Sequence, residues 1–440
     1  MDPIEVNAAG IDIGAESHWV AVPSGRGGAG GDVREFNAFT EGLHELSAWL
    51  KRCGVRAVAM ESTGVFWIPL FELLESDGFD VKLVDARHVR NVSGRKSDVL
   101  DCQWLQQLHA FGLLSAAFRP EEDICVLRSY LRQRAMLVSC ASQHIQHMQK
   151  ALTQMNLKLQ HVLSDISGVS GLKILRAIIA GEHNPRVLAK LRDGRCRSSE
   201  ETIVAALTGS YRKEHLFALQ QALELYDLYQ QKITACDGQI QAQLECFDDR
   251  SGGGLPPPCK PRKAGGTGNA PGFDLRGSLY RMLGVDLTAV PGLDAYTVAK
   301  IVAEIGTDMS AWPTVGHFAS WLGLCPGTRI SGGRRLSGKV KRCANRAAQA
   351  LRVSAQALSR SKSALGALYR NVRSRQGPAA ANTATAHKLA RLVYTLIRTR
   401  EPYRDEGETG YLQNTRTRLL RNLQRKARAL NLLLVPAPVC

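Results

Sequence analysis

The sequence predicts an α/β domain at the front of the chain, followed by domains that are mainly α-helical. Three observations support this α/β plus α class. Strand-like and helix-like segments alternate over the first 115 residues, and apolar residues recur every three or four positions in two long stretches further on. A Gly/Pro-rich segment then separates these stretches from a strongly basic C-terminal third. With 440 residues, the chain has room for about two to four domains.

The front of the chain, residues 1–118, shows the α/β alternation. Apolar and β-branched runs predict a hairpin from residues 10–24 and 33–39, and two further strands at 55–62 and 79–86. Intervening segments with helical spacing predict helices from Gly42 to Arg52, from Trp67 to Ser76 and from Ser97 onward.

The middle of the chain, residues 119–247, is expected to be a coiled-coil domain. Apolar residues in three- and four-residue steps from Ile124 to Val162 predict one long helix, and those from Leu216 to Leu244 predict a second. Shorter and less regular helices are expected between about 165 and 213. The simplest packing is an antiparallel pair of long helices, which could also form a dimer seam.

Residues 248–277 contain the run DDRSGGGLPPPCKPRKAGGTGNAPG, whose composition predicts a flexible linker. Residues 278–412 are expected to be helical with loops, including a helix over 380–400. Residues 413–440 form a basic tail, for which a disordered arm and a docking helix are both open readings.

Charge is the first indication of a partner. Lys and Arg number 57 against 40 Asp and Glu, a formal net charge of +17. Residues 1–100 are net negative, whereas the stretch between Asp308 and Glu401 has 17 Lys and Arg and no acid. So long an acid-free stretch favours a polyphosphate partner, that is, nucleic acid. A ribosome-adhering protein or one that binds anionic metabolites is the alternative.

Cysteine usage and hydropathy indicate the compartment. The 11 cysteines are scattered without a CxxC pair, which predicts a reduced, cytoplasmic chain without a zinc knuckle. No apolar run reaches the roughly 20 residues of a membrane-spanning helix, and the first residues, MDPIEVNAAG, do not resemble a signal peptide. We therefore expect no association with a membrane.

Four carboxylates carry the predicted chemistry. Asp12 lies in the apolar strand GIDIG, and Glu61 lies near the end of the strand VRAVAMES, so neighbouring strands could present both at one sheet edge. Asp98 and Asp101 are three residues apart and share one face of the helix that begins near Ser97. Four converging carboxylates require cations, and hard oxygen donors favour Mg²⁺ or Mn²⁺ over zinc. Such a set suits two-metal phosphodiester chemistry.

Each acid taken alone has an ordinary explanation. Asp12 could be a turn residue, while Asp98 and Asp101 could cap and stabilise the start of a helix. It is the order of the four acids along the chain that favours a site. Glu16 and His18 either form an outer shell of that site or are loop-facing polar residues.

Several segments resemble the DEDD transposases of the insertion sequence one-ten family. They are GIDIGAESHWVAV, MESTGVFWIPLFELLESDGFDVKLVDARHVRNVSGRKSDVLDCQWLQQL, VPGLDAYTVAKIVAEIG, FASWLGLCPGTRISGGRRLSGKVKRCANRAAQALR and AHKLARLVYTLI. The resemblance covers both ends of the chain in the same order. It implies a RuvC-like domain with an RNase H fold over 1–118, in which Asp12, Glu61, Asp98 and Asp101 bind divalent metal. It also implies a transposase domain over 278–412.

The resemblance further implies a serine nucleophile in the transposase domain. Family members form a covalent phosphoserine link to DNA in a composite site that the RuvC-like carboxylates complete. The corresponding loop, TRISGGRRLSGKVKR, has Ser331 before the glycine pair and Ser337 as the runner-up. Glycines allow the backbone to approach a phosphate closely, and neighbouring arginines can neutralise developing charge. Without the resemblance, a mobile loop would be the simpler reading.

Partners follow from the same resemblance. Family members act on donor and target DNA, guided by a structured noncoding bridge RNA, and exchange between two duplexes implies a dimer or tetramer. Such a protein would work in the bacterial cytoplasm, associated with the nucleoid. The cations expected to contact nucleic acid are Arg334, Arg335, Lys339, Lys341, Arg342 and Arg346.

The segment from Pro291 to Gly306 is similar to a helix-hairpin-helix element, whose helix amides can hold a DNA phosphate. Ordinary helix packing explains the same segment equally well.

For the whole chain, two alternatives to a recombinase remain. One is a non-catalytic RNA- or DNA-binding scaffold, and the other is a Holliday-junction nuclease that hydrolyses DNA without a covalent serine intermediate.

Overall fold

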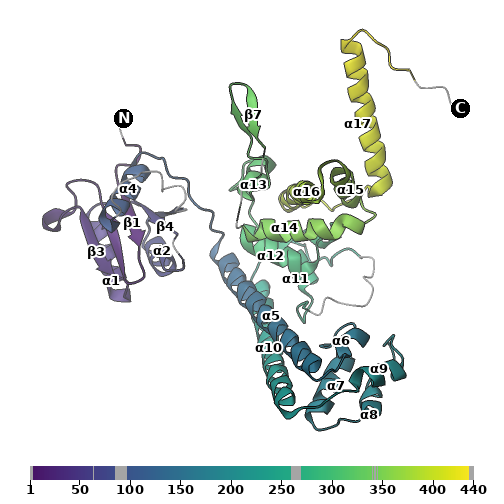
Figure 1. Ribbon diagram of the computed structural model, residues 1–440. Helices are drawn as coiled ribbons and strands as arrows, with labels where there is room; N and C mark the ends of the chain where they lie inside the picture. Colours follow the sequence, from purple (N-terminus) through teal and green to yellow (C-terminus); the bar gives the residue numbers. More distant parts are fainter. Residues whose placement is uncertain are drawn as a thin grey trace. The chain divides into compact units, whose positions relative to one another are not determined.

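The computed structural model describes residues 3–62, 64–84, 97–258, 269–338, 340, 343 and 345–435. The chain divides into two compact units, Met1–Arg119 and Pro120–Cys440, which are called here the first and the second unit. Figure 1 shows the elements of each unit in chain order. Within the described ranges, no helix is both long and apolar enough to cross a membrane.

The first unit is built on a five-stranded mixed sheet of order β3-β2-β1-β4-β5. Its strands are β1 (Ala8–Ile13), β2 (Ser17–Ala21), β3 (Val33–Asn37), β4 (Ala57–Glu61) and β5 (Asp80–Val84). β1, β2 and β3 pair antiparallel, whereas β4 pairs parallel with both β1 and β5. This mixed sheet with its helices is RNase H-like, which confirms the predicted class. Residues 10–24, predicted as one arm of a hairpin, themselves contain most of β1, a turn and β2.

Helices cover both faces of this sheet. Alternate residues of β1 and β4, such as Ile11 and Met60, belong to the core that α1 (Thr40–Arg52) and α2 (Trp67–Ser76) complete. The helix α4 (Asp98–Ala110) packs on β1 from the opposite face, as its contacts with Gly10 show. Side chains that alternate along a strand therefore divide between an apolar core and a face covered by α4.

The second unit begins with two long helices, α5 (Glu122–Gln154) and α10 (Lys213–Glu245), which pack antiparallel as predicted. Their contacts run in opposite directions, since Arg134 meets Asp237 and the earlier Asp123 meets the later Gln243. The predicted first helix was too long. It ends at Gln154 because Asn156 takes a positive φ of 56°, after which the chain turns into short helices.

Short helices lie between the two long ones. They are α6 (Leu159–Val162), α7 (Val169–Ile179), α8 (Pro185–Ala189) and α9 (Glu200–Leu207). The described ends of the predicted linker contact neighbouring elements, because Arg250 N donates to Arg281 O at 2.7 Å and Gly272 N donates to Asp237 Oδ2 at 3.1 Å. Residues 259–268 lie outside the described residues.

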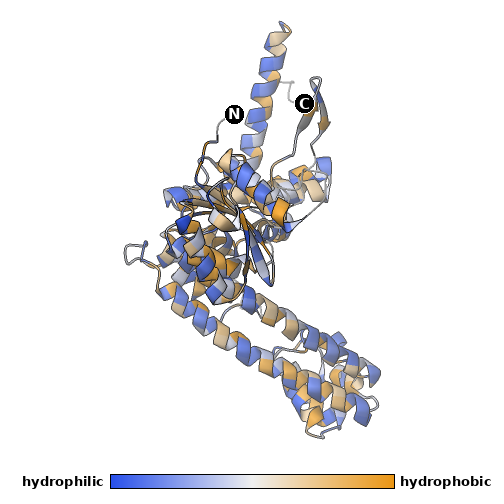
Figure 2. Cartoon of the chain, turned by 90° about the vertical axis from the view of Figure 1, so that its left-hand side faces the viewer, coloured by the Kyte–Doolittle hydropathy of each residue, from blue (hydrophilic) through white to orange (hydrophobic). Residues whose placement is uncertain are grey.

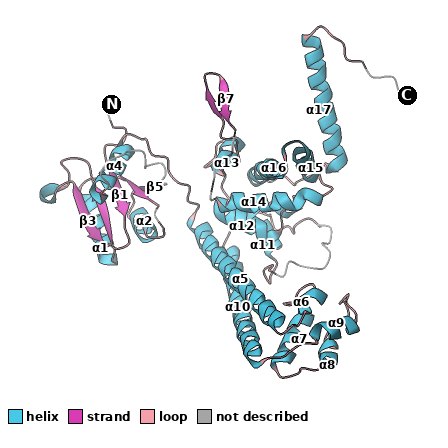
Figure 3. Ribbon diagram, viewed as in Figure 1, coloured by secondary structure: helices cyan, strands magenta, loops and turns pink. Residues whose placement is uncertain are grey.

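The C-terminal part of the second unit is mainly helical, as predicted. Its helices are α11 (Leu275–Leu283), α12 (Ala295–Ile305), α13 (Val315–Trp321), α14 (Arg346–Ala357), α15 (Ala364–Gln376) and α16 (Pro378–Thr399). Aromatic rings of Trp312, Phe318, Trp321 and Tyr394 pack together between α13 and α16. One element was missed: a hairpin of β6 (Arg329–Ser331) and β7 (Arg334–Ser337), seen in magenta in Figure 3.

The basic tail contains a helix, α17 (Gly407–Ala429), which has no buried residue. Its start packs on α15, where Arg370 pairs with Glu408 at 2.8 Å, so the predicted boundary at 412/413 falls within this helix. Figure 2 shows hydrophilic and hydrophobic residues interspersed along the long helices. Of the two readings for the tail, a helix matches its described part.

Candidate active site

Close contact between β1 and α4 organises the candidate site. A Cβ atom added at Gly10 would lie 2.3 Å from Gln106 N and 2.4 Å from Cys102 O, so only glycine allows the helix to approach this closely. Gln106 Nε2 donates to Ala8 O at 3.1 Å, which fixes the later turns of α4 to the start of β1. β1 and α4 therefore run in opposite directions, so the part of β1 that carries Asp12 lies toward the N-terminus of α4.

The strand register sets Asp12 beside Glu61. Gly10 pairs with Ala59 and Ile11 with Met60 on the parallel strands, so the next residue of each strand is a carboxylate. Ile11 and Met60 belong to the apolar core, and side chains alternate along a strand. Asp12 and Glu61 therefore lie on the face that α4 covers, at the carboxyl ends of β1 and β4. Both residues are half-buried.

The first turn of α4 carries the other two acids. Ser97 caps the helix by accepting a hydrogen bond from Leu100 N at 3.4 Å, and Asp98 and Asp101 follow in the first turn. Next to them, burial raises the pKa of the Cys102 thiol to about 12, with the negative charges of Asp12 and Asp101 contributing to this rise. The shared influence on Cys102 shows that Asp12 lies near the start of α4.

The backbone thus places Asp12 and Glu61 on neighbouring strands, with the first turn of α4 close to Asp12. Among the residues that the structure describes, however, no three or more His, Cys, Asp or Glu side chains are arranged to hold a metal ion. The available donors at this edge are carboxylate oxygens, which fit Mg²⁺ or Mn²⁺ rather than zinc. Residues 85–96, which connect β5 to α4, lie outside the described residues.

His18 lies on the other side of the sheet. It pairs in register with Ile13, and its neighbour two residues on, Val20, belongs to the apolar core. Only 2% of His18 is exposed, and burial lowers its pKa. The structure therefore favours a core position for His18 over an outer shell around the acids.

Ser331 lies at the end of β6 in the second unit, directly before the hairpin turn. Gly332 and Gly333 have φ values of 54° and 73°, the positive values that a two-residue type I′ turn requires at both central positions. Ser331 pairs with Arg334 across the turn, and both residues are exposed. Among the residues that the structure describes, a Cβ atom at either glycine would meet nothing within 4 Å, so there is open space beside the turn.

The structure describes only part of the predicted set of cations. Arg334 lies opposite Ser331, and Arg346 is exposed at the first position of α14. The side chain of Arg335, together with Lys339, Lys341 and Arg342, lies outside the described residues.

The turn that resembles a helix-hairpin-helix element is packed against other helices. A Cβ atom at Gly292, whose φ is 90°, would lie 3.0 Å from the Leu358 side chain and 3.1 Å from Ser354 O. Asp294 caps α12 by accepting from Thr297 N at 2.7 Å. Because the turn is covered and a helix amide is already bonded, these contacts favour the packing interpretation over phosphate binding at the turn.

Sequence reasoning missed the residues that position the acids. Gly10 precedes Asp12 by two residues in AAGIDIG, and a glycine inside a buried strand is a signal of close backbone approach. Gln106 gives no such signal, because its partner, Ala8, is 98 residues earlier in the chain.

Comparisons with known families gave two matches, one over the residues that carry the four acids and one over the serine hairpin. Residues 9–157, which contain all four acids, match a family described as transposase, the DEDD transposases of IS110 elements. Residues 286–370, which contain the serine hairpin, match the family described as transposase IS116/IS110/IS902. A search among curated proteins gave no match.

An RNase H-like sheet with a DEDD sequence match, followed by a matching C-terminal domain, defines the chain as a transposase, an enzyme that cleaves DNA and transfers its strands. It belongs to the IS110 family, with a DEDD N-terminal domain and a C-terminal domain of the Transposase_20 type.

Proposed function

We propose that this transposase mobilises a bacterial insertion sequence by cutting and rejoining DNA through a covalent link to Ser331, guided by a bridge RNA. The carboxylates of Asp12, Glu61, Asp98 and Asp101 bind Mg²⁺ or Mn²⁺ in this proposal. The observation that carries it is the position of Asp12 and Glu61 on one face of neighbouring parallel strands, beside the first turn of α4.

The four acids divide into two structural pairs. Asp12 and Glu61 extend from rigid strands, so their backbone positions are fixed by the sheet. Asp98 and Asp101 depend on the contact of α4 with Gly10. Divalent ions held there would supply positive charge to the reacting phosphodiester. The protein's own contribution is to keep both pairs at one edge.

The proposed covalent step uses the Ser331 hydroxyl. Its oxygen forms a bond to phosphorus as the bond from phosphorus to the leaving strand oxygen breaks, and the hydroxyl proton passes to a base while the leaving oxygen gains one. The seryl phosphodiester retains the energy of the original bond, so a second strand hydroxyl can reverse the exchange and rejoin DNA. Arg334, opposite Ser331, is placed to offset negative charge on the phosphate.

Charge and exposure support nucleic-acid partners of the C-terminal part. The stretch between Asp308 and Glu401 lacks acids, and α17 adds a basic helix that has no buried residue. Pairing with a bridge RNA would supply the choice of sequence, which is consistent with backbone contacts that read no bases. Exchange between two duplexes needs more than one active site, so we propose a dimer or tetramer formed through α5 and α10.

The test is to trap the protein–DNA link. Full-length protein is incubated with its copurified RNA, Mg²⁺ and DNA that carries an element end, and covalent adducts are separated under denaturing conditions and located by mass spectrometry. We expect Asp12→Asn and Ser331→Ala to abolish the adduct while DNA binding persists. Ser337→Ala, a serine of the same hairpin, is the matched control and should retain it.

Each alternative predicts a different result. An adduct that persists in Ser331→Ala would remove Ser331 from the mechanism. Metal-dependent cleavage without any adduct would favour a Holliday-junction nuclease. Binding without cleavage, together with no carboxylate-dependent stabilisation by Mg²⁺, would favour a non-catalytic scaffold.

A further inference from the structure

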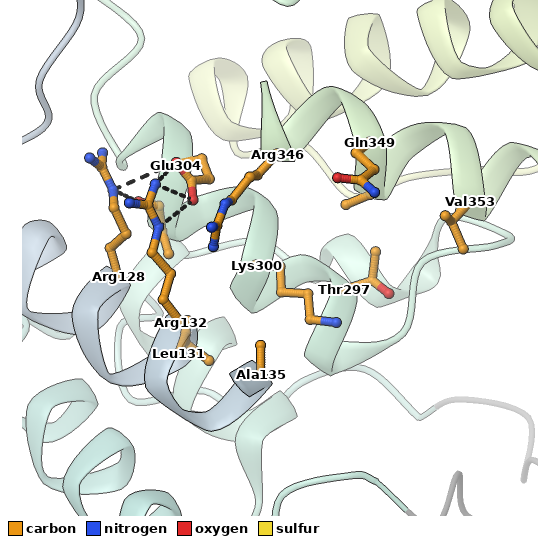
Figure 4. Close-up of a pocket in the computed structure, with 12 residues that line it drawn as sticks. Arg128, Leu131, Arg132, Ala135, Thr297, Lys300, Glu304, Arg346, Gln349 and Val353 are labelled. Carbon is orange, nitrogen blue, oxygen red and sulfur yellow. Dashed lines mark hydrogen bonds and ion pairs between the residues drawn. The ribbon is translucent and has the colours of Figure 1, made fainter. Parts of the chain in front are cut away.

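A hollow of about 410 Å³ lies in the second unit, among α5, α12 and α14 (Figure 4). It is lined by side chains of three helices, of which α14 follows the serine hairpin in the chain. Those that carry charge are Arg128, Arg132, Lys300, Glu304 and Arg346. Four cations thus face one carboxylate, and the lining has a net charge of +3.

The single carboxylate is already engaged. Glu304, whose side chain is 15% exposed, accepts hydrogen bonds from Arg132 at 2.9 Å and lies 3.7 Å from Arg128 Nε. Arg128 Nε also donates to Ala303 O at 2.8 Å. Glu304 therefore holds two guanidinium groups at one end of the hollow, and its negative charge is balanced by theirs.

The other two cations have no carboxylate partner within the described part of the chain. Figure 4 shows Lys300 extending from α12 and Arg346 extending from α14, in the space between α14 and α5. Lys300 Nζ lies 4.0 Å from the ring centroid of Tyr296, a contact that positions the ammonium group without neutralising it. Loss of hydration lowers the pKa of Lys300, with the charge of Arg134 adding to this effect and that of Asp294 opposing it.

Small residues keep the hollow open. Ala135, Ala303 and Ala350, one from each of the three helices, lie along its wall, while Thr297 and Gln349 add polar groups. The result is a concave, cationic surface with hydrogen-bond donors, which is the chemistry that recognises a phosphate group.

We propose that this hollow binds a backbone phosphate of duplex DNA, with Lys300 and Arg346 as its direct contacts and the Glu304 ion pairs as its rigid wall. DNA is favoured as the source of this phosphate because α14 begins within the stretch between Asp308 and Glu401, which has 17 Lys and Arg and no acid. Positive charge therefore continues along the chain beyond the residues that line the hollow. The inference deepens the proposed function, since it names a place where the transposase holds DNA. It requires neither metal nor the serine.

The test measures binding of full-length protein to a fluorescent DNA duplex in EDTA at several salt concentrations, where no cleavage can occur. Each of Lys300→Gln and Arg346→Gln should raise Kd about 3- to 10-fold and reduce the slope of log K against log salt by about 0.9. The double variant should reduce the slope by about 1.8. The matched control is Lys232→Gln, an exposed lysine on α10 that does not line the hollow, and this variant should bind as the unmodified chain does.

Glu304→Gln tests the same idea in the opposite direction. It raises the net charge of the hollow by one and preserves the shape of the side chain, so tighter binding and a steeper salt slope are expected. Circular dichroism of every variant confirms that the helices are intact.

Unchanged affinity and slope in the double variant would overturn the proposal. A larger loss with single-stranded RNA of equal length than with the duplex, or a larger loss with an acidic peptide, would also overturn the assignment to DNA. Absence of the serine adduct in the unmodified chain, together with the expected reduction of the salt slope in these variants, would contradict the proposed mechanism alone.

Discussion

Replacing Gly10 by alanine tests whether α4 is held against β1 as closely as the structure shows. The added methyl group would lie 2.3 Å from Gln106 N and 2.4 Å from Cys102 O, where ordinary contacts begin at 3.4 Å. Both of these atoms belong to the helix backbone, so no side-chain rotation can relieve the overlap. The helix must move by roughly 1 Å, and such overpacking costs about 1–3 kcal/mol.

The displacement also has a catalytic consequence. Asp98 and Asp101 move with α4, whereas Asp12 stays with the sheet. Because a misplacement of about 1 Å can lower a rate roughly 10²-fold, we expect the Gly10→Ala variant to lose DNA cleavage on that scale. The same variant should keep its affinity for DNA, since the contacts proposed for DNA lie in the second unit.

Native-state hydrogen exchange, read on peptides from β1 and α4, is the suitable stability assay because the two units need not unfold together. The matched control is Gly238→Ala in α10, where an added Cβ meets nothing within 4 Å. That change should stabilise its helix by about 0.5–1 kcal/mol, since glycine is costly inside a helix. Equal protection of β1 and α4 in Gly10→Ala and in the unmodified chain would refute the reasoning.

Two further predictions concern buried charge. Arg134 is 1% exposed and bonds to Asp237, so Arg134→Met should leave that carboxylate underpaired and destabilise the second unit by about 3–5 kcal/mol in urea unfolding. Arg134→Met combined with Asp237→Leu should recover most of this loss, and full stability of the single variant would contradict the account. Burial lowers the pKa values of His18 and His109, so the unfolded chain binds protons more readily. The free energy of unfolding of the first unit should therefore be at its full value above about pH 6.5 and fall as the pH drops below it. Protection factors of the first unit against hydrogen exchange that stay constant between pH 8 and pH 5 would contradict this prediction.

Local patterns were sufficient for most elements of the fold. The start of α4 near Ser97 was predicted correctly, although Asp98 was considered as the cap and the structure has Ser97 in that role, and α10 followed from its apolar spacing. The end of α5 did not, because the apolar steps continue beyond Asn156, where a positive φ turns the chain. The β6–β7 hairpin was missed although its glycine pair between short strands is a turn signal, because its apolar residues Ile330 and Leu336 are exposed and give no core pattern.

The candidate site was only partly accessible from the sequence. Strand ends and a helix start were enough to select the four acids, and the IS110 relationship predicted from the quoted segments is confirmed by both family matches. The register of β1 on β4 and the seating of α4 on Gly10 depend on contacts between distant parts of the chain. The hollow lined by Arg128, Lys300 and Arg346 is likewise assembled from three separate helices, so no local motif marks it.

Anomalous diffraction from crystals soaked in Mn²⁺ tests the central claim most directly, because it locates the ion independently of any activity. The account predicts anomalous peaks at the carboxyl ends of β1 and β4, roughly 2.0–2.3 Å from oxygens of Asp12, Glu61 and the first turn of α4. It also predicts that Asp12→Asn removes them. Peaks elsewhere in the chain, or a peak that remains unchanged in Asp12→Asn, would contradict the account.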